Sequence, residues 1–410
     1  MQVVKGEMGM TGTSEEVSGG GILDGLLVLD ISSFVAAPAA ATVMADFGAN
    51  VIKVEPPTGD PLRRLHYIPP LPDCDEDYCW QIVGRNKRSL VLDLKDDKDW
   101  NKLSQLVRQA DVVITNYPHR VVEKLRLTWE DLAPLNDRLI YAWVTGYGET
   151  GPEAGRPGFD MNAYWARSGL MDAVRDAEAP PAHSMPGMGD CPTSMSLFGA
   201  IMMALFKREQ TGKGLKVGTS LMANGLWANS ITLQAVLSGA TFTDRVSRRE
   251  WPNALTNKFC ARDGRWLIIS IMDEDDAWDR VLECVDRPEW KDDPRFQTTA
   301  ARHDNAPALT ASLDEAFAER NFDEWQQRFQ KYRITAGTVE LATDIMSNEQ
   351  ALATNALLPM GDADAGAEYT INSPIWVHGH DKIPPGAIAS VGQHTEEILR
   401  EFGINEEETS

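Results

Sequence analysis

The stretch that decides the fold is GLLVLDISSFVAAPAAATVMADFGANVIKVE, residues 25–55. Its first apolar run, Leu26–Ile31, predicts a buried parallel strand, because such a strand is covered on both faces and its residues need not alternate. Pro38–Phe47 predicts a helix, with proline near its start and Gly48 directly after its end. Val51–Val54 predicts a second strand. The stretch is therefore a strand–helix–strand unit, from which parallel sheets are built.

The same pattern continues along the chain. Apolar runs at 89–94, 111–115 and 138–145 predict further strands, and helical stretches at 97–109 and 119–134 separate them. We therefore expect an α/β fold whose main lobe is a Rossmann-like, doubly wound parallel sheet. The first turn, SSFVAAP, lacks the glycines that let a backbone approach a pyrophosphate, so NAD or FAD binding is not expected.

The rest of the sequence predicts further parts. Helices are expected at 191–210 and 221–238, and a hairpin that turns at Asp263–Gly264 precedes helical stretches at 273–286 and 306–330. These features indicate a smaller α+β lobe. The predicted organisation is a flexible arm (1–22), a large Rossmann-like domain (23–224), a small α+β domain (225–345), and a linker with a C-terminal helix returning to the large domain (346–410).

Composition narrows the function classes. A net charge of −22 argues against a nucleic-acid or anionic-membrane partner, because binding phosphates requires positive charge. The N-terminus lacks the apolar core of a signal peptide, and no apolar run reaches the length of a membrane span. Five scattered cysteines fit a reducing cytoplasm, and neither the cysteines nor the histidines have metal-ligand spacing. We expect a cytoplasmic protein without a metal site.

Two basic segments stand out in this acidic chain. Arg85, Lys87 and Arg88 lie in GRNKRS, at the entrance to a predicted strand. Asn116 and Tyr117 follow another strand, with Arg120 and Lys124 on the next helix. Local positive charge outside parallel strands suits a phosphorylated ligand, although a solvated loop would have the same composition.

The sequence leaves open whether two aspartates have a structural or a chemical role. Asp160 in PGFD could cap a helix over 161–172, and Asp190 in PGMGDCP could cap the helix that follows it. Gly187 and Gly189 would let a ligand approach the backbone beside Asp190. A helix N-terminus is also expected to keep this carboxylate ionised, which is the state that a nucleophile needs.

Taken in order, several blocks resemble the class III CoA-transferases, the family of formyl-CoA, carnitine, aryllactate and bile-acid CoA-transferases. The resemblance runs from about residue 22 to 405. It is carried by LDGLLVLDISSFVAAPAAATVMADFGANVIKVEPPTGDPLR, NKRSLVLDLK, ADVVITNY, LNDRLIYAWVTGYGETGP, PGFD, GMGD, ALFKREQTGKGLKVGTSL and VGQHTEEIL.

The resemblance implies an interlocked, ring-like homodimer that binds CoA on the Rossmann-like lobe. By position, the residues matching the CoA-contacting segments are Lys87, Arg88, Asn116, Tyr117 and Lys124. Asp190 matches the nucleophile, which passes CoA from an acyl-CoA to a free carboxylic acid through a mixed anhydride and an aspartyl-CoA thioester. No tightly bound cofactor is implied, and Asp160 is expected to support the acceptor side.

Two alternatives stay open, an α-methylacyl-CoA racemase of the same fold and a non-catalytic CoA-binding protein. The racemases carry a histidine where this chain has Phe159, and phenylalanine cannot exchange a proton. Val35 and Ala36 replace a more polar stretch of formyl-CoA transferase, and Pro56 and Pro57 replace arginines near the adenine. The segment REWPNALTN at 249–257 stands where formyl-CoA transferase has a longer glycine loop. Together these departures favour an acceptor that is larger and more apolar than formate or oxalate: a 2-hydroxy, aryl-substituted, carnitine-like or bile acid.

Overall fold

A six-stranded sheet with order β3-β2-β1-β4-β5-β6 organises the first part of the chain, and every neighbouring pair is parallel. The computed structural model describes residues 21–69, 71–361 and 367–404, so most of the predicted N-terminal arm lies outside the described residues. The predicted α/β fold with a parallel sheet is confirmed. The strands are β1 (Leu27–Asp30), β2 (Asn50–Glu55), β3 (Lys87–Val91), β4 (Val112–Thr115), β5 (Ile140–Thr145) and β6 (Leu215–Ser220).

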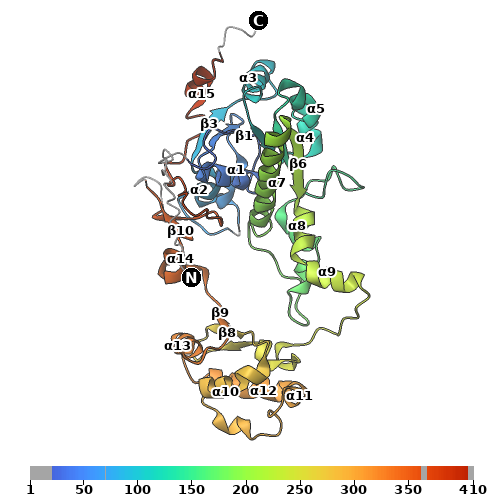
Figure 1. Cartoon of the computed structure of the whole chain (residues 1–410), viewed down its shortest axis with the longest axis vertical. Helices are drawn as coiled ribbons and strands as arrows, with labels where there is room; N and C mark the ends of the chain where they lie inside the picture. The colour runs from blue at the N-terminus through green and yellow to red at the C-terminus, as the bar shows by residue number, and fades with distance from the viewer. Residues whose placement is uncertain (1–20, 70, 362–366, 405–410) are drawn as a thin grey trace, which may run out of the picture. The chain divides into compact units, whose positions relative to one another are not determined.

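Helices cover both faces of this sheet (Figure 1). On one face, α1 (Ala36–Asp46) packs against α7 (Asp190–Thr211). Alanines on α1 allow this close approach because their side chains are short. The other face packs against α3 (Asp97–Val107), α4 (His119–Lys124), α5 (Trp129–Leu132) and the C-terminal α15 (Thr395–Glu401). Such two-sided cover explains why the strands are continuous apolar runs.

The C-terminal segment covers the outer edge of β3. The backbone N–H of His394 donates to the Ser89 carbonyl at 3.0 Å, and the Val91 N–H donates to Thr395 Oγ1 at 3.1 Å. The guanidinium of Arg88 pairs with Glu397 at 3.1 Å. Backbone groups at this sheet edge therefore have partners from the end of the chain.

Two predicted helices are each divided in the structure. The stretch 119–134 breaks near Arg126, whose φ of 56° is left-handed, and Thr128 caps α5. The stretch 221–238 forms α8 (Leu221–Ala228) and α9 (Ser230–Leu237). Between α8 and α9, the Asn229 side chain donates to the Ser168 carbonyl at 3.0 Å, a long-range contact that local helical periodicity cannot reveal.

The described residues form two compact units. The second unit consists of Met171–His183 and Ile231–Ala351. The prediction of a small α+β domain over 225–345 did not include Met171–His183. The hairpin predicted around Asp263–Gly264 is present, with Gly264 at a φ of 82°. The elements of this unit are β7 (Lys258–Cys260), β8 (Trp266–Ile269) and β9 (Ala336–Thr338), with α10 (Glu274–Val285), α11 (Thr299–Asp304), α12 (Ala306–Phe317) and α13 (Phe322–Tyr332).

Smaller elements complete the chain. They are α2 (Tyr78–Gly84), α6 (Leu170–Ala173), α14 (Glu349–Ala353), the antiparallel pair β10 (Leu357–Pro359) and β11 (Tyr369–Ile371), and the short 3-10 segment η1 (Pro61–Tyr67). Across the described ranges, no helix has both the length and the apolar character needed to cross a bilayer.

Candidate active site

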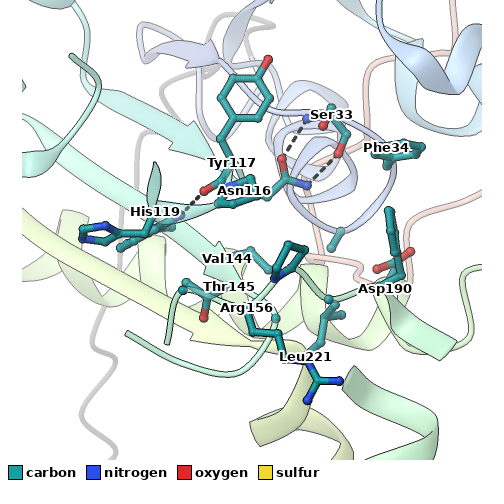
Figure 2. Close-up of a pocket in the computed structure, with 18 of the residues that line it drawn as sticks. Ser33, Phe34, Asn116, Tyr117, His119, Val144, Thr145, Arg156, Asp190 and Leu221 are labelled. Atoms are coloured by element: carbon teal, nitrogen blue, oxygen red, sulfur yellow. Dashed lines mark hydrogen bonds between the residues drawn. The ribbon is translucent and has the colours of Figure 1, made fainter. Parts of the chain in front are cut away.

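A cavity of about 170 Å³ lies where the loops after β1, β4 and β5 meet (Figure 2). In the strand order, β1 and β4 flank the point where the sheet reverses direction, which is where open α/β sheets bind their ligands. Six of the predicted site residues line this one cavity: Val35, Ala36, Asn116, Tyr117, Phe159 and Asp190. The fold thus brings together residues up to 155 positions apart in sequence.

The loop after β1 is tied to the loop after β4 by Asn116. Its side-chain oxygen accepts from the Ser33 N–H at 2.9 Å, and its amide nitrogen donates to the Ser33 carbonyl at 2.7 Å. The dashed lines in Figure 2 mark both bonds. Asn116 therefore fixes the wall of the cavity as well as lining it.

Asp190 is the first residue of α7, after the N-cap residue Gly189. Among the residues that the structure describes around this cavity, it is the only carboxylate. Gly187 has a φ of 77°, which favours glycine. A Cβ on Gly189 would lie 2.5 Å from Cγ of Tyr164. The backbone before Asp190 can therefore pack this closely against the Tyr164 ring only because residue 189 is glycine.

The charge state of Asp190 differs from the sequence-based expectation. Burial, reinforced by the negative charge of Asp160, raises the pKa of Asp190 to about 7. The prediction that the helix N-terminus holds this carboxylate ionised was wrong, because burial and the charge of Asp160 both favour the neutral form. Near pH 7 the carboxyl group is therefore part neutral and part charged, and only the charged part can act as a nucleophile.

Asp160 does not cap a helix. It is the first residue of the π-helical turn η3 (Asp160–Ala166), and the N-cap residue is Phe159, whose N–H donates to Asn162 Oδ1 at 2.7 Å. Asp160 Oδ2 is buried and has no hydrogen-bond partner among the described residues. Its charge acts on Asp190, which is a functional connection that the spacing of the two residues does not reveal.

A substitution at Gly189 tests the close packing of the residues before α7 against Tyr164. We expect Gly189→Ala to lower the free energy of unfolding by about 1–3 kcal/mol and to reduce turnover, because its Cβ overlaps Tyr164. Gly199→Ala is the matched control within α7, since a Cβ there meets nothing within 4 Å and alanine is the better helix former. Denaturant titration and activity of both variants check this; equal behaviour of the two would contradict it.

The basic cluster around residues 85–88 is not available to a phosphate. Lys87 Nζ is buried and donates to Asp30 at 2.9 Å, and Arg85 is buried against Asp46 at 2.8 Å. Arg88 pairs with Glu397 of α15. These cations do not form the free positive patch that the sequence suggested, because each has a carboxylate partner within the chain. Lys124 is exposed on α4.

Sequence reasoning missed three groups that line the cavity, Phe34, His119 and Arg156. In Figure 2, Asp190 and Phe34 lie on one side of the view and His119 lies on the other. Arg156 Nη1 donates to Glu153 at 2.6 Å, and its guanidinium lies over the Tyr147 ring. The signal was present in the sequence, since Arg156 directly precedes the PGFD block.

A second cavity, of about 340 Å³, lies next to the segments that follow β2 and β3 in the six-stranded sheet. It is lined by Pro56, Pro57 and Lys95, and Tyr117 lines both cavities. Tyr117 thus marks where the two cavities adjoin. Elsewhere, the parts of the chain that the structure describes contain no group of three or more His, Cys, Asp or Glu side chains able to hold a metal ion.

Comparison with known proteins places these features in a family. Residues 23–395 match CoA-transferase family III. The chain is 28% identical to (R)-2-hydroxy-4-methylpentanoate CoA-transferase of Clostridioides difficile, over 94% of this chain and 96% of that protein. It is 29% identical to cinnamoyl-CoA:phenyllactate CoA-transferase of Clostridium sporogenes, over 94% of this chain and 95% of that protein.

A solved structure agrees with this result. The crystal structure of a CAIB/BAIF family protein from Brucella suis superposes with a TM-score of 0.82 at 28% identity, covering 93% of this chain and all of that one. The family match spans nearly the whole sequence, including the loops after β1, β4 and β5 that form the cavity, and Asp190. The chain therefore belongs to CoA-transferase family III.

Proposed function

We propose that this CoA-transferase moves CoA from an acyl-CoA thioester to a free carboxylic acid by covalent catalysis on Asp190. The observation that carries the proposal is the placement of this carboxylate: it is the only one among the described residues of the cavity, and it lies at the reversal point of the sheet. Transfer through covalent intermediates preserves the thioester energy that hydrolysis would lose.

The proposed steps balance without a further reactant. An Asp190 oxygen attacks the thioester carbonyl of the donor, and the C–S bond breaks to give a mixed anhydride and CoA thiolate. The thiolate attacks the Asp190 carbonyl carbon, releasing the donor acid as carboxylate and leaving an aspartyl-CoA thioester. The acceptor carboxylate attacks this thioester, and the released thiolate then attacks the acceptor carbonyl. The product acyl-CoA leaves, and Asp190 is regenerated.

For CoA, the proposal retains Asn116, Tyr117 and Lys124 from the predicted contacts. Tyr117 lines both the Asp190 cavity and the cavity beside Pro56, so a long ligand could extend from one to the other. Lys124 is exposed on the helix that follows this loop. Lys87, Arg88 and Arg85 are left out because their charges have carboxylate partners within the chain.

For the acceptor, we propose a medium-sized acid with an apolar substituent. Phe34, Val35, Ala36 and Phe159 form apolar walls of the Asp190 cavity. The two named relatives act on 2-hydroxy acids with a branched or aromatic substituent, which fits these walls. Of the predicted acceptor classes, the 2-hydroxy and aryl-substituted acids are therefore the first to test, before carnitine-like and bile acids.

Arg156 is the proposed partner of the acceptor carboxylate. It supplies a permanent cation in the lining of the cavity, and a guanidinium binds a carboxylate through two parallel hydrogen bonds. Its Nη1 donates to Glu153, but the Arg156 side chain is 59% exposed, unlike Arg85 and Lys87, so its other N–H groups can meet a ligand. We expect Arg156→Gln to raise KM for the acceptor acid about 10-fold, with a smaller change in KM for the acyl-CoA donor. Initial rates over both substrates measure this. Arg167→Gln is the control, since Arg167 pairs with the same Glu153 but does not line the cavity; an equal effect of both variants would reject the assignment.

The predicted homodimer stays a proposal. Large apolar side chains are exposed in the chain by itself, with Met203 69%, Phe206 70% and Trp227 81% exposed on α7 and α8. Exposure on this scale suits a surface that a second copy covers. Light scattering should then give twice the chain mass of 45.3 kDa. The cytoplasmic location also stays a prediction.

One experiment separates the possible activities. The enzyme is incubated with an acyl-CoA, hydroxylamine is added, and peptides are analysed by mass spectrometry. A hydroxamate on Asp190 supports covalent transfer. A panel of acyl-CoAs that yields neither this adduct nor CoA exchange would overturn the proposal, and solvent deuterium entering the α-carbon of the acyl group would favour a racemase.

A further inference from the structure

The segment from Ser32 to Pro38, which comprises the loop after β1 and the first residues of α1, is held by side chains from other strands and loops. Lys53 Nζ donates to the Ser32 carbonyl, and Lys87 Nζ donates to the Pro38 carbonyl at 2.7 Å. Asp60 Oδ1 accepts from the Phe34 N–H at 3.2 Å. With the Asn116 bonds to Ser33, the backbone of this segment is fixed at four positions, and three of the partners are charged.

The charged partners belong to one cluster of two lysines and two aspartates, all at most 5% exposed. Lys53 lies 3.0 Å from Asp60 and 3.5 Å from Asp30, and Lys87 lies 2.9 Å from Asp30. None of the four side chains lines the Asp190 cavity, as far as the structure describes its walls. Burying four charges costs free energy, and replacing buried ion pairs with apolar residues often leaves a protein equally stable or more stable. A gain in stability therefore does not by itself explain why this cluster is present.

The loop also carries a strained residue. Phe34 has a φ of 61°, a left-handed conformation that is unusual for a bulky side chain. Such a conformation persists when the surroundings over-determine it. In this position the Phe34 ring meets the Phe159 ring edge to face, with centroids 5.6 Å apart and planes at 87°. Both rings line the cavity that contains Asp190.

We propose that the cluster of Asp30, Lys53, Asp60 and Lys87 positions the acceptor-binding wall by holding Phe34 in this conformation against Phe159. The two rings then form a preformed apolar surface for the aromatic or branched substituent of the acceptor acid. This inference rests on the proposed function. It also gives Lys87 a new role, because its contact with the first turn of α1 acts on the acceptor side of the site and not on CoA.

The test compares an acid with an aromatic substituent, 3-phenylpropanoate, with acetate, which has none. We expect Asp60→Ala to lower the ratio of kcat/KM for 3-phenylpropanoate over acetate about 5–10-fold, chiefly through KM, because the Phe34 ring is released. Asp60→Asn keeps an oxygen that can accept from the Phe34 N–H and should restore most of the ratio. In a Phe34→Gly background, Asp60→Ala should have no further effect on it.

Matched controls separate positioning from loss of stability. Asp46→Asn removes the charge of another buried ion pair, with Arg85, that does not line the cavity. It should lower Tm without changing the ratio. If Asp60→Ala does not fold, Asn116→Ala releases Ser33 of the same loop without leaving a buried charge unpaired, and the ratio should fall in the same direction.

Two results would overturn the inference: an unchanged ratio in the folded loop variants, or an Asp60→Ala effect that persists in the Phe34→Gly background. Calorimetric Kd values for 3-phenylpropanoate give the same comparison without turnover. If the wild-type enzyme transfers CoA to neither acid nor to the wider panel, the proposed function fails, while these Kd values still decide whether the cluster positions Phe34.

Discussion

Replacing Asp190 by asparagine is expected to lower kcat for CoA transfer by at least about 10³-fold, because the amide is not a nucleophile and cannot form either covalent intermediate. The described lining of the cavity contains no second carboxylate to take over its role. Steady-state rates with an acyl-CoA and a free acid measure the loss. The hydroxamate adduct should disappear together with the activity.

A neighbouring variant controls for damage to the start of α7. Cys191→Ala changes the next residue in the same helical turn, and Cys191 does not line the cavity. It should retain transfer within about 2-fold, since the Cys191 side chain is exposed and is not part of the cavity lining. Transfer by Asp190→Asn at a rate near that of Cys191→Ala would remove Asp190 from the mechanism.

The second large effect is on the pH profile. Because the pKa of Asp190 is raised to about 7 by burial and by Asp160, kcat/KM should fall about 10-fold for each pH unit below that value. Asp160→Asn removes the nearby negative charge and should move this acid limb to lower pH. A profile that stays flat between about pH 5 and 8 would contradict the raised pKa.

The same titration should appear in stability, with a definite sign. The pKa of Asp190 is about 7 in the folded chain and 3.8 as its ordinary value, so folding favours the protonated form. The stabilisation from this group is complete below pH 3.8 and is lost as pH rises through about 7. At pH 8, Asp190→Asn should therefore have a free energy of unfolding up to about 4 kcal/mol higher than that of the wild type, and a higher unfolding temperature. At pH 5 the difference should be smaller.

Much of the fold follows from local pattern. The alternation of apolar runs and helices between Leu27 and Thr145 predicts the parallel sheet, since strands buried on both faces leave a strong signal. The breaks at Arg126 and Asn229 do not follow from it. Asn229 ends α8 beside Ser168, a contact with a residue 61 positions away that periodicity does not record.

Site residues that lie in recognisable sequence motifs could be predicted. Interactions between charged residues far apart in the sequence could not. Asp190 and Phe159 lie in recognisable motifs, and both line the cavity. Lys87 was assigned to CoA because sequence shows a cation at a strand start but not the side chain opposite. Its partner, Asp30, ends a strand 57 residues earlier. The raised pKa of Asp190 likewise depends on segments that bury it from elsewhere in the chain.

The cover over β3 has a consequence for the order in which the protein is made. Val91 and the threonine that pairs with its N–H are 304 residues apart. A ribosome that has completed the strand must translate about 300 further residues before the partner exists. Throughout that time the nascent sheet has an open edge able to pair with other chains. This edge is thus covered only after the segment around Thr395 has been made, and until then it can associate with other chains.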